Sequence, residues 1–173
     1  MRPIVIAVFA VMLSSCATQS DLRQASDNLV AQDADPATVA TLADTIGFDE
    51  DGKNARVFIV EAVDGTQIRN ALNAGTRFGF GSATGFAPMP TDRKVPLAQR
   101  TYTLKATHIG GAPIAQLFGM AKGSFKSISG EVAFKPEAGR AYKVNGVLTE
   151  AEAAVWIEEV ESGKAVTSRV HGK

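Results

Sequence analysis

The chain has 173 residues, of which 45% are apolar and 21% are charged, which is typical of one globular domain that needs no metal or disulfide to form its core. Lys and Arg total 18 and Asp and Glu total 18, so there is no basic excess to attract phosphate backbones, and nucleic acid is not an expected partner. The single cysteine excludes an internal disulfide and any metal or iron–sulfur site built from several cysteines.

The first fifteen residues have the three-part layout of a secretory signal. Arg2 supplies a positive charge, residues 4–13 are uncharged and rich in Ile, Val, Ala and Phe, and Ser14 and Ser15 are small residues before Cys16. A helix that spans a bilayer needs about 20 apolar residues. This shorter run therefore favours removal on export over a permanent span.

Leu13-Ser14-Ser15-Cys16 resembles the lipobox of bacterial lipoproteins. The resemblance implies that residues 1–15 are a signal peptide and that Cys16 becomes the lipid-bearing first residue, carrying palmitate or similar chains. Several acyl chains on one residue suffice for stable membrane anchoring. In that family an aspartate directly after the cysteine favours the inner membrane, and position 17 is Ala, so the resemblance implies the outer membrane and a domain that faces the periplasm.

Residues 16–52 are predicted to be a lipidated tether with one short helix. The polar stretch 17–34 has too little apolar surface to fold alone. Asp35 and Pro36 form an N-cap and first-turn pair, and apolar residues then recur at helical spacing until Gly47. The apolar positions are Val39, Leu42, Ala43 and Ile46. They predict an amphipathic helix over about residues 36–46 that packs on the core, or alternatively docks a partner near the membrane.

The rest of the chain has the patterns of β-strands. Residues 56–63 are a β-branched run that is apolar on both faces and ends at Asp64-Gly65, which predicts a central strand opening a hairpin. Residues 101–109 alternate, with Tyr102, Leu104, Ala106 and His108 on one face, which predicts a half-buried strand. Further strands are expected at 128–134 and 140–148.

Residues 148–163 give conflicting signals. Thr149 and Glu152 match a capping box, and the apolar residues after them fit helical spacing. Against this, Val155-Trp156-Ile157 is β-prone, and Glu161-Ser162-Gly163-Lys164 is typical of a hairpin turn before a last strand. We interpret the segment as a strand.

Gly139 and Tyr142 resemble the tyrosine corner of immunoglobulin-like sandwiches, which implies that the phenol bonds back to nearby backbone and that both residues are structural. Together with the strand spacing, this predicts a mainly β domain over residues 53–170, an immunoglobulin-like or transthyretin-like β-sandwich.

A second resemblance is spread over residues 55–167, to small uncharacterised proteobacterial lipoproteins. Its pieces are Val63-Asp64-Gly65, Arg93-Lys94-Val95-Pro96, Gly139-Arg140-Ala141-Tyr142-Lys143-Val144-Asn145-Gly146 and Val155-Trp156-Ile157-Glu158. Because that family has no assigned activity, the resemblance implies a location and a fold but no reaction.

Two apolar, glycine-containing stretches are candidate binding loops. Residues 73–90 carry Phe78, Phe80 and Phe86, and residues 111–120 form a second loop that could cap an open end of the sandwich. Long loops in compact domains often carry function. The phenylalanines either tuck into the sandwich edge or form an exposed patch that meets a protein or a glycan.

The chemistry-bearing residues form no recognisable catalytic set. His171 lies close to the end of the chain, and His108 is in phase with an apolar face, where it is either a core histidine bonded to a carbonyl or a buried base. The sequence has no G-x-S-x-G elbow. No cofactor, metal or enzymatic activity is expected.

The leading hypothesis is therefore a lipid-anchored cell-envelope module that binds or scaffolds another envelope component. One alternative is a hydrolase of envelope polymers that uses carboxylates such as Glu137, Glu158 or Glu159, brought together by folding. Another alternative is an accessory lipoprotein of a secretion or pilus apparatus.

Overall fold

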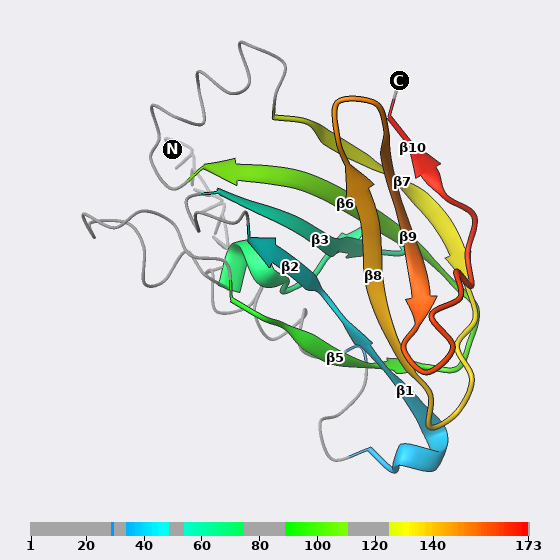
Figure 1. Cartoon of the computed structure of the whole chain (residues 1–173). Helices are drawn as coiled ribbons and strands as arrows, with labels where there is room; N and C mark the ends of the chain where they lie inside the picture. Colours follow the sequence, from blue (N-terminus) through cyan, green and yellow to red (C-terminus); the bar gives the residue numbers. More distant parts are fainter. Residues whose placement is uncertain (1–28, 30–33, 49–53, 75–88, 111–124, 173) are drawn as a thin grey trace, which may run out of the picture.

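The computed structural model describes residues 29, 34–48, 54–74, 89–110 and 125–172, and these are mainly β (Figure 1). After a short 3₁₀ turn, η1 (Pro36–Thr38), the strands are β1 (Val39–Ala43), β2 (Thr45–Phe48), β3 (Asn54–Val63), β4 (Thr66–Gln67), β5 (Asp92–Pro96), β6 (Arg100–Gly110), β7 (Ser127–Phe134), β8 (Ala141–Leu148), β9 (Ala153–Glu159) and β10 (Val170–His171). Residues 71–74 form one helical turn.

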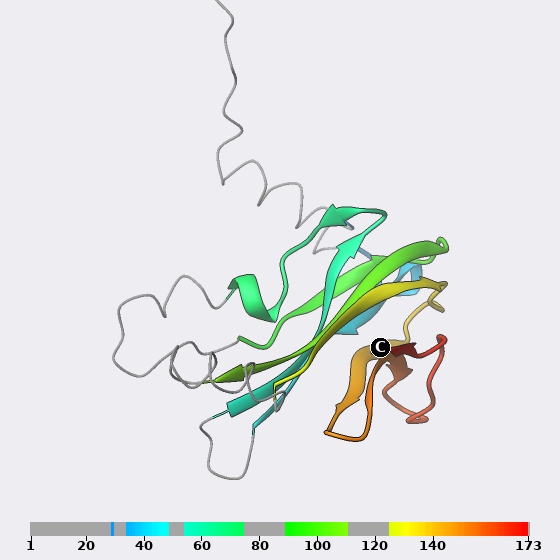
Figure 2. The same cartoon turned by 90° about the horizontal axis from the view of Figure 1, so that it is seen from above.

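The strands form two sheets that pack face to face (Figure 2). Sheet A has the order β10-β9-β8-β1-β5, and sheet B has the order β2-β3-β6-β7 with β4 beside β3. Strand β1 runs parallel to β8, and the other neighbours are antiparallel. The chain crosses from sheet A to sheet B at Asp44, the single residue between β1 and β2.

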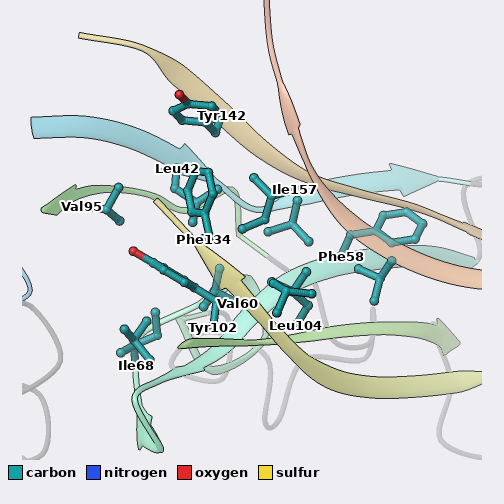
Figure 3. Packing of buried hydrophobic residues seen from close by; sticks show 14 of the residues in the cluster. Leu42, Phe58, Val60, Ile68, Val95, Tyr102, Leu104, Phe134, Tyr142 and Ile157 are labelled. Carbon is teal, nitrogen blue, oxygen red and sulfur yellow. The ribbon is translucent and has the colours of Figure 1, made fainter. Parts of the chain in front are cut away.

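The main core fills the space between the sheets (Figure 3). Alternate side chains of both sheets point inward, because successive residues of a strand face opposite sides. The ring of Phe134 packs edge-on against Tyr102, with centroids 5.5 Å apart, and against Tyr142 at 4.9 Å. The largest fully buried side chains are Tyr102, Leu42, Ile59, Leu104 and Ile157. Burial of each such aliphatic side chain contributes about 1.5 to 3 kcal/mol.

Strand β3 is buried on both faces, as its two-sided apolar sequence predicts. Phe58 and Val60 point into the main core, whereas Val57 and Ile59 point to the outer face of sheet B. There they form a second cluster with Ala71 of the helical turn. The central position of the strand, between β2 and β6, is confirmed.

The hairpin after β3 is also confirmed. Asp64 and Gly65 have φ values of 49° and 76°, the left-handed conformation that a two-residue turn between twisted strands requires. The Asp64 Oδ1 atom accepts a hydrogen bond from the backbone N–H of Thr101 at 2.9 Å. The turn residue therefore also ties the hairpin to β6.

The helix predicted over residues 36–46 is wrong beyond its first turn. Asp35 caps that turn as expected, since its side chain accepts the N–H of Ala37 at 2.9 Å. From Val39 onward, however, the backbone is extended.

The reason is a buried acid that masks the alternation of a strand. Ala40 and Leu42 point into the main core, and Asp44 is the next inward position in this period of two. The carboxylate of Asp44 interrupts the period-two alternation of apolar residues. The apolar residues that remain fit the spacing of a helix, so the sequence predicts a helix here. Residues 39–48, expected in the tether, instead belong to the two sheets as β1 and β2.

The strand interpretation of residues 153–159 is confirmed. Thr149 and Glu152 form the turn between β8 and β9: the N–H of Thr149 donates to the Glu152 carbonyl at 2.8 Å, and the N–H of Glu152 donates to Thr149 Oγ1 at 3.0 Å. A Thr-x-x-Glu motif thus caps a hairpin here, not a helix. The predicted turn at Gly163 is present, and Ala165 bridges back to Glu158.

Tyr142 makes the hydrogen bond that the tyrosine-corner resemblance implies. Its phenol oxygen accepts the backbone N–H of Glu137 at 3.1 Å, and Gly139 in the intervening turn has a φ of 71°. The N–H of Gly139 donates to the Val39 carbonyl at 2.9 Å. The corner therefore fastens the turn before β8 to the start of β1.

Candidate functional site

Several residues singled out in the sequence lie outside the described residues. These are the signal segment 1–15, Cys16, and the loop phenylalanines Phe78, Phe80 and Phe86. The described residues do place the points from which the two apolar loops leave the sheets.

Three of the connections between described segments begin or end at the same end of sheet B. We call this end of the sheet the loop end. Phe48 at the end of β2 pairs with Ala55, and Asn54 at the start of β3 pairs with Gly110 at the end of β6. Figures 1 and 2 show these strand ends on the same side as the helical turn 71–74. The connections that begin or end there include both candidate binding loops.

Two large apolar side chains are exposed at the loop end. Phe48 is 59% exposed, and Met89 is 39% exposed. The N–H of Met89 donates to the Ala71 carbonyl at 3.1 Å, which places the start of the β5 segment beside the helical turn. An exposed phenylalanine at the end of a sheet is chemically suited to contact a partner.

The N-terminal part of the domain enters at the opposite end, which we call the tether end. Leu29 packs against the main core, and the Ala34 carbonyl accepts a hydrogen bond from Lys94 Nζ at 3.0 Å. Val39 at the start of β1 pairs with Pro96 of β5. The ten residues from Val39 to Phe48 then cover about 30 Å of extended chain and reach the loop end.

His108 lies near the loop end and is half-buried. Its Nδ1 atom accepts the backbone N–H of Lys126 at 3.1 Å, and its ring stacks on Phe125 with centroids 5.4 Å apart. The Nδ1 atom of His108 is therefore a hydrogen-bond acceptor. His171 is exposed in β10.

The three carboxylates of the hydrolase alternative lie in two different places. Arg140 pairs with Glu159, with its Nη1 atom 3.0 Å from Oε1, and with Glu137, with its Nε atom 3.7 Å from Oε2. Glu158 is the neighbour of Glu159 on an extended strand, so it points to the other face of sheet A.

Glu158 is held by its neighbours on that outer face. Lys143 Nζ lies 3.1 Å from its Oε1 atom, and Asn145 Nδ2 donates to its Oε2 atom at 2.8 Å. Burial alone would raise the pKa of Glu158, but the hydrogen bonds from Asn145 and Lys143 outweigh it and hold the pKa below its usual value. This carboxylate therefore stabilises the pairing of β8 with β9.

An ion pair that the sequence analysis did not predict lies where the chain crosses between the sheets. The side chain of Asp44 is fully buried, and that of its partner Arg93 in β5 is 10% exposed. Arg93 Nη2 donates to Asp44 Oδ2 at 2.7 Å and to the Arg69 carbonyl at 3.3 Å.

The Asp44 carboxylate also accepts two backbone hydrogen bonds. Val60 donates to Oδ1 at 3.1 Å, and Ala71 donates to Oδ2 at 2.9 Å. Burial raises the pKa of Asp44, and the nearby Arg93 charge and the hydrogen bonds offset part of that rise. An acid within an alternating apolar segment is the sequence signal for such a group, because a buried carboxylate needs partners.

The helical turn next to Asp44 is capped by a reciprocal pair of asparagines. Asn70 Oδ1 accepts the N–H groups of Leu72 at 3.0 Å and Asn73 at 3.1 Å, and Asn73 Oδ1 accepts the N–H of Asn70 at 2.8 Å. This arrangement is the asparagine equivalent of a capping box. The capped turn covers part of the outer face of sheet B through Ala71.

Within the described ranges, no group of three or more His, Cys, Asp or Glu residues is arranged to hold a metal ion. None of the helical segments that the structure describes has the length and apolar character needed to span a bilayer.

A scan against models of known protein families finds no match, and searches of curated proteins and of solved structures find none either.

Proposed function

We propose that the mature chain is a lipid-anchored binding or scaffolding module of the cell envelope, held in the outer membrane through Cys16, facing the periplasm and acting without catalysis. The observation that carries the binding role is the gathering of exposed Phe48, exposed Met89 and the ends of both apolar loops at one end of sheet B. The partner is an envelope protein or glycan, met through apolar and aromatic side chains.

The two packed sheets are proposed to be an immunoglobulin-like or transthyretin-like sandwich. The Tyr142 hydrogen bond to the turn before β8 supports the immunoglobulin-like arrangement, in which such a corner recurs. Loops at the ends of such sandwiches are common binding surfaces. This fold would present the loop end as a recognition surface on a rigid frame.

The direction of the chain supports a consistent orientation for that surface. The described chain reaches β1 through Ala34 and η1 at the tether end, and Leu29 lies thirteen residues after Cys16, which allows at most about 47 Å of extended chain between them. The loop end lies at the other end of sheet B (Figure 1). The anchored domain would thus direct its loop end, with Phe48, away from the membrane that holds it.

The lipid anchor is tested first, in cells that make the full chain. Metabolic labelling with a palmitate analogue should mark the wild type, and Cys16→Ser should abolish the label and release the protein from membranes. An unlabelled wild type, or a Cys16→Ser variant that stays equally membrane-bound, contradicts the anchor and with it the location.

The binding surface is then examined by crosslinking in membranes, with Phe48→Ser and a combined Phe78→Ser, Phe80→Ser and Phe86→Ser variant. Loss of large aromatic contacts should lower recovery of a crosslinked partner about tenfold or more. Val160→Ser is the matched control, because Val160 is 50% exposed but follows β9 at the tether end. Equal recovery with all variants contradicts the loop end as the binding surface and leaves the anchor unaffected.

A further inference from the structure

We propose that Asp44 and Arg93 form a latch that holds the helical turn 71–74 down on the outer face of sheet B, so that opening the latch exposes apolar surface beside Phe48. The latch is a conformational device of the fold. It goes beyond the binding role above and does not depend on the lipid anchor.

The covered surface is a continuous apolar patch. Ala55, Val57, Ile59 and Ile109 face outward from sheet B and are buried, with Ala71 packed against them. Leu72 and Ile46 are partly buried at the margin of the same cluster. The pairing of Ala55 with Phe48 joins this patch to the exposed apolar side chain of the loop end.

The Asp44 carboxylate fills a gap in the backbone pairing of β3. On this edge of β3, strand β2 pairs with residues 55–58 and β4 with residues 62–63. Val60 lies between the two and donates its N–H to Asp44 instead of to a strand. The same side chain thus takes the place of a missing neighbouring strand.

The second backbone bond of Asp44 fastens the helical turn. Ala71 is the first residue of that turn, where a backbone N–H has no acceptor within the helix. Its N–H donates to Asp44 Oδ2, and Asn70 and Asn73 bond to each other at the start of the same turn. One carboxylate therefore couples β3 to the cover of its outer face.

Arg93 completes the latch by neutralising the buried carboxylate. Its guanidinium bridges Asp44 and the Arg69 carbonyl, which directly precedes the capped turn. Removal of either partner leaves a buried charge without its counterpart, which is strongly unfavourable. The ion pair and the position of the turn are thus coupled.

The test is hydrogen exchange on the intact chain with Asp44→Asn, which leaves one acceptor oxygen for two backbone N–H groups. Exchange of the amides of residues 71–74 should rise about tenfold or more, the ratio that corresponds to about 1.4 kcal/mol. Binding of a fluorescent apolar dye should rise with it, while β6 to β9 keep their protection. Glu158→Gln makes the same chemical change at a buried carboxylate of sheet A and should leave residues 71–74 unchanged.

If Asp44→Asn does not fold, a second variant, Arg93→Met, tests the latch. Arg93→Met retains both carboxylate oxygens of Asp44 as acceptors for the backbone but leaves its buried charge unpaired, and it should likewise raise exchange at residues 71–74 and dye binding in the same place. Wild-type exchange at residues 71–74 in the folded variants overturns the latch. An increase of equal size in β6 to β9 overturns it as well, because the ion pair would then support the whole fold and not this cover.

Discussion

At the scale of single residues, two buried tyrosines of one aromatic cluster differ in what their hydroxyl groups do. Tyr142 accepts a backbone N–H, whereas the Tyr102 hydroxyl is buried and has no hydrogen-bond partner in the part of the chain that the structure describes. Burial raises the pKa of Tyr102 to about 12, as expected of a phenol held away from water. Tyr102 therefore stabilises the fold through the packing of its ring, whereas Tyr142 does so through both the packing of its ring and the hydrogen bond to its oxygen.

The same substitution at the two sites should have different effects on stability. Tyr142→Phe loses the hydrogen bond to Glu137 and should lower the free energy of unfolding by about 1 kcal/mol. Tyr102→Phe removes a buried, unpaired hydroxyl and should be neutral or slightly stabilising. Urea unfolding followed by the fluorescence of the single tryptophan measures both, and equal losses would contradict the assigned roles.

Some contacts of single residues can be predicted from the sequence, and others cannot. The bond of Tyr142 could be predicted because a turn glycine and a tyrosine at fixed spacing are local in sequence. The partners of Asp44 could not, since Arg93 lies 49 residues away and is brought to it by the pairing of β1 with β5. Local motifs predict local contacts, and buried charge pairs are settled by topology.

At the scale of elements, strands with plain alternation were predictable, and those interrupted by a polar inward residue were not. Strand β6 alternates Tyr102, Leu104 and Ala106 on its buried face. The sequence of β1 and β2 predicts a helix instead of strands, because Asp44 breaks the apolar series at an inward position. The period of a short segment is therefore ambiguous when one buried position is charged.

Gly146 in β8 lies where the two sheets pack closely together. A Cβ atom on Gly146 would lie 2.6 Å from Cε1 of Phe58 and would also collide with the Ala154 carbonyl oxygen. Gly146→Ala should lower the free energy of unfolding by about 1 to 3 kcal/mol, the usual cost of overpacking.

The control for that substitution lies in β2. A Cβ atom on Gly47 would meet nothing within 4 Å, and Gly47 has no positive φ. Gly47→Ala should be neutral or stabilise by about 0.5 kcal/mol through the unfolded chain. If both variants shift the thermal unfolding midpoint by the same amount, the close contact of Phe58 with β8 is wrong.

At the scale of the whole molecule, two buried carboxylates contribute to the free energy of unfolding in ways that change in opposite directions with pH. The pKa of Glu158 is lowered by folding, so its contribution is fully present above its ordinary pKa of 4.5 and is lost as the pH falls through the folded value. The pKa of Asp44 is raised, so its contribution falls as the pH rises from 3.8 towards the folded value. Acid therefore weakens the contacts of Glu158 and does not weaken the fold through Asp44 in the same range.

Glu158→Gln isolates the first contribution. At pH 7 it should lower the free energy of unfolding by about 1.5 kcal/mol, because hydrogen bonds to a charged group are lost. The difference from wild type should shrink as the pH falls below about 4.5, and urea unfolding at a series of pH values measures it. Glu137→Gln, at a side chain that is 76% exposed, is the control and should change the free energy of unfolding little at pH 7. A constant difference at all pH values would contradict the account.

The parallel pairing of β1 with β8 has a consequence for biogenesis. Thr41 pairs on one side with Lys94 and on the other with Ala141, which lies 100 residues later in the chain. Both partners of β1 are therefore synthesised well after it. Contacts of such long range form slowly, because a large loop must close before they contribute. Sheet A of such a chain cannot be completed until β8 has been made, and for the exported protein proposed above this delay would favour passage through a translocation channel as an unfolded chain.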